Sequence, residues 1–62
     1  MSKSIDVFAI AEVIVNLKNL RKDYADSAEW CEANGKASGV KFNNRRVAEI
    51  DDMIATLKAA MK

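Results

Sequence analysis

The densest group of side chains with binding chemistry is the basic segment Lys41–Arg46, with Lys36 shortly before it. Arginine forks match the geometry of phosphate oxygens, and an aromatic ring such as Phe42 or Trp30 stacks on a nucleobase. The segment also stands where a helix is predicted to begin, and helix N-termini attract anions. The candidate anion-binding residues for a phosphate, a nucleotide or a nucleic-acid backbone are Lys36, Lys41, Asn44, Arg45 and Arg46.

The same arginines have an alternative explanation. Arginines are unfavourable beside the positive end of a helix dipole, so they need either a bound anion or an acidic neighbour. Glu49 stands four residues after Arg45, and Glu29 and Glu32 are expected at the same end of the fold. Ion pairs with these acids account for the cluster without any ligand. The sequence leaves both explanations open.

Residues suited to catalysis or metal binding are sparse. The chain has no histidine and a single cysteine, so it lacks the commonest general base and a zinc ligand set. It also contains no glycine-rich phosphate loop and no nucleophile elbow. Cys31 falls on an apolar helical stripe, where a free cysteine behaves as a small hydrophobe rather than a redox group. We expect no catalytic residue, no metal, no cofactor and no enzymatic activity.

The elements that position these residues are predicted from two heptad stripes, in which mostly apolar side chains recur every three or four residues. The first stripe is Ile10, Val13, Leu17, Leu20, Tyr24, Ser27 and Cys31, and the second is Val47, Ile50, Ile54, Leu57 and Met61. Folding the chain back pairs Cys31 with Val47, Tyr24 with Ile54 and Leu17 with Met61. The stripes therefore predict an all-α fold, an antiparallel two-helix hairpin.

Capping signals predict where the helices begin and end. Ser4 and Asp6 both suit a helix N-terminus, and Asn34-Gly35 suits a helix C-terminus with glycine in the left-handed conformation. The chain is expected to form one domain over residues 1–62. Within it we predict a first helix at about 5–33, a loop at about 34–43 and a second helix at about 44–61.

The predicted loop contains Val40 and Phe42 in an alternating pattern. We expect these two side chains to fold over the base of the hairpin. Trp30, one position off the first stripe, then has two possible places. It either packs beneath this loop or contributes to an interface, where tryptophan is enriched.

The predicted register leaves the start of the first helix without a partner, because the second helix has ended once Leu17 faces Met61. Burial of one large apolar side chain is worth about 1.5–3 kcal/mol, so leaving several of them in water is costly. We expect this segment to mediate self-association, most simply as a dimer that completes a four-helix bundle. Its residues are Ile5, Val7, Phe8, Ile10, Ala11, Val13, Ile14 and Val15. In the alternative, residues 4–15 bend back over the hairpin.

Size and composition agree with self-association. A chain of 62 residues is marginal as an isolated fold, and oligomerisation is a usual remedy. The net charge of +1 provides no general attraction to nucleic acid or membranes. The most apolar stretch, residues 7–15, is too short to span a bilayer and lacks the features of a signal peptide. A cytoplasmic protein with a reduced cysteine is expected.

Two functions follow as expectations. The first is a small non-enzymatic interaction protein that self-associates through its first helix and binds or blocks a protein partner. The alternative is a small protein that binds a nucleotide, phosphate or nucleic acid through the basic segment. A sequence-reading DNA-binding protein is disfavoured, because the net charge is near zero and no helix-turn-helix spacing is present.

Overall fold

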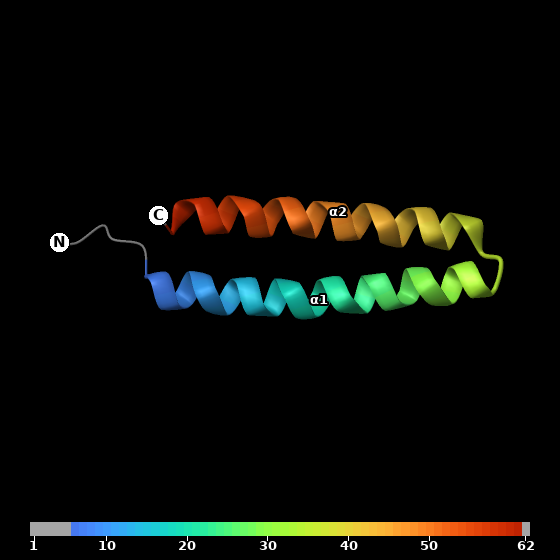
Figure 1. Ribbon diagram of the computed structural model, residues 1–62, viewed down its shortest axis with the longest axis horizontal. Coiled ribbons are helices and arrows are strands. Elements are labelled where there is room, and N and C mark those ends of the chain that lie inside the picture. Colours follow the sequence, from blue (N-terminus) through green and yellow to red (C-terminus); the bar gives the residue numbers. More distant parts are fainter. Residues whose placement is uncertain (1–5, 62) are drawn as a thin grey trace.

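The computed structural model describes residues 6–61, which form two long helices joined by a short turn. Helix α1 (Val7–Ala33) and helix α2 (Ala37–Ala60) lie side by side and run in opposite directions (Figure 1). The start of α1 and the end of α2 lie at one end of the rod, and the turn lies at the other. The predicted all-α helical hairpin is confirmed.

The first helix begins at the capping residue that the sequence indicates. The Asp6 carboxylate accepts hydrogen bonds from the backbone N–H groups of Phe8 at 2.9 Å and Ala9 at 3.4 Å. These bonds satisfy two of the donors that every helix N-terminus leaves free. Ser4, the other predicted cap, lies outside the described residues.

The C-terminus of α1 is a Schellman turn built on Gly35. The N–H of Lys36 donates to the carbonyl of Cys31 at 2.8 Å, and the N–H of Gly35 donates to that of Glu32 at 3.2 Å. Gly35 has a φ of 68°, in the region where only glycine is free of a side-chain clash. The chain therefore reverses within three residues, as the Asn34-Gly35 signal indicates but much more tightly than the predicted loop.

The predicted loop over residues 34–43 is wrong, because α2 begins at Ala37. Val40 and Phe42 lie in its first turns and form no extended cover. Val40, Asn43 and Val47 continue the heptad spacing of the second stripe, so helical periodicity was present in this segment. Because the turn at Gly35 reverses the chain early, the residues with this periodicity become part of α2. Asn43 and Asn44 therefore lie inside the helix and do not act as its N-cap.

The shorter turn changes the register of the hairpin by about seven residues, or two helical turns. Tyr24 lies against Arg46 rather than Ile54, and Arg21 bonds to Asp51. A shift of one heptad superimposes each stripe on itself, so matching the stripes alone does not distinguish the two registers.

The core sits between the helices toward the end with the chain termini. Ile10, Ile14, Ile50 and Ile54 form it, and Leu17, Tyr24, Leu57 and Met61 pack against it. Ile50 is the most buried of the four isoleucines, with 2% of its surface exposed. The prediction that Ile10 and Ile14 lack partners in their own chain is therefore wrong: the new register gives them partners on α2.

The face that α1 turns toward α2 also differs from the predicted stripe. Ile14 and Ala28 are buried and Arg21 is half-buried, whereas their neighbours Val13, Leu20 and Ser27 are exposed. Both sets of residues repeat every seven positions, one on each side of the line through Leu17 and Tyr24. The predicted stripe on α2 is confirmed from Val47 to Met61. As a result, α1 leaves an apolar edge open.

Candidate interaction surface

An apolar groove lies along one side of the hairpin, near the end with the chain termini. It has a volume of about 440 Å³ and is lined by Val13, Leu17, Asp52, Met53, Thr56 and Leu57. Val13 and Met53, on opposite walls, are 45% and 47% exposed. Leu20 continues the wall of α1 one heptad beyond Val13 and is 41% exposed. We call this the apolar groove.

Toward the turn, the same side of the hairpin carries an aromatic and cationic cluster. The rings of Tyr24 and Phe42 meet edge to face, with centroids 6.4 Å apart. The guanidinium carbon of Arg46 lies 5.4 Å from the centroid of the Tyr24 ring, within cation–π distance. Phe42 is 57% exposed, so one side of the cluster is open to solvent.

Arg46 is the best-connected residue of this cluster. Its Nη1 donates to the Glu49 carboxylate at 2.9 Å. The adjacent Tyr24, followed by Glu49, raises the pKa of Arg46 above its usual value, so the side chain stays charged. Its Nε is screened from solvent but finds no acceptor among residues 6–61. One donor of the guanidinium is thus unsatisfied within the hairpin.

The opposite edge of the helix interface is polar. Arg21 crosses from α1 to α2, donating from Nε to Asp51 at 2.6 Å and from Nη2 at 3.3 Å. The hydrogen bond and the charge of Asp51 raise the pKa of Arg21. Lys22 pairs with Asp26 along α1, and this hydrogen bond and charge raise the pKa of Lys22. These exposed pairs stabilise the fold only modestly, but they make the two edges of the hairpin different.

The basic segment does not lie at a helix N-terminus. Because α2 begins at Ala37, residues 41–46 occupy its second and third turns, and Lys36 at the N-cap makes no side-chain capping bond. The prediction that a helix terminus reinforces an anion site is therefore wrong.

The members of the basic segment are also divided. Lys41 and Arg45 line a small depression of about 250 Å³ with Ser38 and Phe42. Arg46 turns instead toward Tyr24, and Asn44 is exposed on α2. Of the predicted anion-binding residues, the structure brings together only Lys41 and Arg45.

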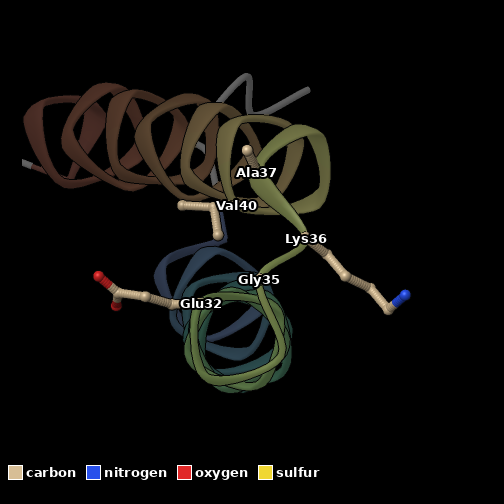
Figure 2. Close-up of a pocket in the computed structure, with 5 residues that line it drawn as sticks. All are labelled: Glu32, Gly35, Lys36, Ala37 and Val40. Carbon is tan, nitrogen blue, oxygen red and sulfur yellow. The ribbon is translucent and has the colours of Figure 1, made fainter.

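A hollow of about 320 Å³ lies at the turn, lined by Glu32, Gly35, Lys36, Ala37 and Val40 (Figure 2). Glu32 and Lys36 extend from opposite sides of the turn, and Val40 lies between the two helices. The charged groups do not converge on a common point, so this hollow offers a ligand no set of side chains that could bind it together.

The helices approach closely near the turn. The Nδ2 of the buried Asn43 donates to the Gly39 carbonyl at 2.8 Å and lies 3.9 Å from the Cys31 Sγ. A Cβ placed on Gly39 would lie 2.6 Å from that sulfur. Asn43 therefore belongs to the helix interface, which the heptad spacing from Val40 to Val47 would have indicated.

The residues predicted for self-association have different environments. Phe8 is 86% exposed, and Val7, Val13 and Val15 are also exposed, so these four are available to a partner. Ala11 is half-buried, Ile10 and Ile14 belong to the core, and Ile5 lies outside the described residues. Sequence reasoning missed Met53, which completes the apolar groove from α2.

The predicted stacking residues remain open to solvent. Trp30 and Phe42 are each 57% exposed. Since residues 40–42 are helical, the predicted loop that would cover Trp30 does not exist. Of its two predicted places, packing beneath the loop is therefore wrong.

The part of the chain that the structure describes contains no group of three or more histidine, cysteine, aspartate or glutamate side chains placed to hold a metal ion. Neither α1 nor α2 is long and apolar enough to cross a membrane. Comparisons with protein-family models, curated proteins and solved structures found no match to this chain.

Proposed function

We propose that this chain is a non-enzymatic interaction protein that assembles with copies of itself and, in assembled form, binds or blocks a protein partner. The observation that carries the proposal is the apolar groove, whose walls are contributed by both helices. The simplest assembly is a dimer forming a four-helix bundle. The exposed residues Val7, Phe8 and Val15 provide a second apolar contact. The lone cysteine suits a cytoplasmic protein.

The small size of the core supports this proposal. In residues 6–61 the buried apolar side chains are four isoleucines and Ala28. Helices depend on tertiary packing for most of their stability, and a single helical hairpin offers little of it. A second hairpin on the groove would cover Val13, Leu20 and Met53 at once. Covering such a surface is the usual way in which a short helical chain becomes stable.

A charge placed in the groove should disrupt assembly. We expect the wild-type chain to sediment as a dimer at micromolar concentration, and Met53→Asp to raise the dimer dissociation constant by at least about tenfold, because burying a lone carboxylate is unfavourable. Ala55→Asp is the matched control: it adds the same charge to the same helix, on the opposite side, and should leave the constant unchanged. A wild-type mass of 6.9 kDa at these concentrations would contradict self-association.

A second candidate function rests on Lys41 and Arg45. They line one depression with Phe42, and neither forms an ion pair within residues 6–61. If this depression binds phosphate groups, ATP or a short oligonucleotide should raise the melting temperature. Lys41→Ala with Arg45→Ala should abolish that increase, whereas Lys18→Ala with Lys58→Ala should not. Unchanged melting of the wild-type chain with both ligands would reject this function.

A further inference from the structure

On the side of the hairpin that carries the apolar groove, exposed and half-buried side chains of α2 follow an order that is complementary to itself when reversed. They are Phe42, Arg46, Glu49 and Met53, which we call the α2 stripe. Their spacings of three and four residues place them along one side of the helix. Read from both ends toward the middle, the stripe pairs an aromatic ring with a thioether and a cation with an anion.

From this order we infer that the occupant of the surface is a second copy of the chain, with its α2 antiparallel to the first across a two-fold axis level with Val47 and Ala48. The inference rests on the self-association proposed above and names its geometry. Phe42 of each copy meets Met53 of the other, and Arg46 meets Glu49. A symmetric contact of this kind uses the same patch on both copies.

The exposure of the stripe fits this arrangement. Phe42 and Met53 are 57% and 47% exposed, and a thioether against an aromatic edge is a favourable contact. The side chains of Arg46 and Glu49 are 40% and 46% exposed, although they already pair within their own helix. Their surfaces are therefore open to a second chain.

The charges favour the antiparallel arrangement in particular. Two Arg46–Glu49 pairs laid head to tail form a square of alternating charge. A parallel α2–α2 contact would instead place Arg46 on Arg46 and Glu49 on Glu49, which is repulsive.

A mixing experiment tests the geometry. Arg46→Glu and Glu49→Arg, each studied alone as the full chain, place like charges across the axis and should weaken the dimer at least about tenfold in sedimentation equilibrium. An equimolar mixture of the two variants should restore a dimer to within about threefold of the wild-type constant, because only the mixed dimer pairs opposite charges at both contacts. Repair of the intrachain pair does not explain such a result, since neither chain regains it.

Arg45→Glu is the matched control: it makes the same charge change one residue away but keeps Arg46 and Glu49, so by itself it should leave the dimer dissociation constant within about threefold of the wild-type value. A mixture of the first two variants that stays as weak as its components would overturn the antiparallel arrangement while leaving wild-type self-association intact. A monomeric wild-type chain would overturn both.

Cross-linking provides a second measurement in case a charge variant does not fold. In a Cys31→Ser background, chains carrying Phe42→Cys and chains carrying Met53→Cys are mixed and oxidised. We expect covalent heterodimers to form in preference to either homodimer. Equal amounts of all three products, or no disulfide in a mixture that sediments as a dimer, would contradict the arrangement.

Discussion

Replacing Ile50 with alanine is expected to unfold the hairpin. Ile50 is only 2% exposed and sits among the three other isoleucines of the core. Truncating a buried isoleucine to alanine costs about 2–5 kcal/mol. At about 0.05–0.15 kcal/mol per residue, a chain of this length has a total free energy of unfolding that is not much larger. Far-UV circular dichroism should show the loss of most helical signal at room temperature.

Two further variants make this result specific. Ile50→Val removes one methyl group and should cost about 0.5–1.5 kcal/mol, leaving a folded chain with a lower melting temperature. Asn44→Ala, on the exposed side of the same helix, should change the free energy of unfolding by less than about 0.5 kcal/mol. If Ile50→Ala has the same melting temperature as the Asn44→Ala control, the four isoleucines are not the core.

The effect of alanine at Gly39 is expected to depend on Cys31. The new Cβ would stand 2.6 Å from the cysteine sulfur, a distance that forces one helix or the thiol to move. Overpacking of this kind costs about 1–3 kcal/mol, whereas replacing a helical glycine by alanine gains about 1 kcal/mol. Gly39→Ala should therefore lower stability in the wild-type chain. In a Cys31→Ala background, where the sulfur is absent, the same change should raise it.

A double-mutant cycle measured by urea unfolding isolates this coupling. We expect an interaction free energy of at least about 1 kcal/mol between Gly39→Ala and Cys31→Ala. Gly35→Ala is the control, because Gly35 needs its φ of 68° but a Cβ added there would meet no atom of residues 6–61 within 4 Å. It should destabilise the chain equally with and without the Cys31 sulfur. Independence of the Gly39 effect from Cys31 would contradict the close approach of the helices.

Local signals in the sequence predict the ends of α1 well. Asp6 and Gly35 act through hydrogen bonds and backbone conformations that span only a few residues, so the rest of the fold is not needed to interpret them. The start of α2 was missed for the converse reason. Asn43 and Asn44 are good caps locally, but Gly35 had already reversed the chain, and the helical spacing from Val40 to Val47 then extends α2 back to Ala37.

The candidate surface was less predictable than the fold. Val13 and Leu20 are seven residues apart, and so are their neighbours Ile14 and Arg21. Since both sets have the same periodicity, the spacing alone does not show which of them faces α2. Met53 lies outside the predicted stripe of α2. Its place in the apolar groove becomes visible only in the structure, where Val13 lines the opposite wall. Arg46 was grouped with Lys41 because the two are close in the sequence. Adjacent positions on a helix point in different directions, so Arg46 turns away from Arg45 and toward Tyr24.

The sequence by itself determined the helical class, the turn at Gly35, the apolar stripe of α2 and an excess of apolar surface on α1. Each of these depends on spacing within one helix or on the chemistry of a few neighbouring residues. Only the tertiary structure decided the register, because a slip of one heptad preserves every match between two stripes. That register buries Ile10 and Ile14 and leaves Val13, Leu20 and Met53 as the open side of the hairpin.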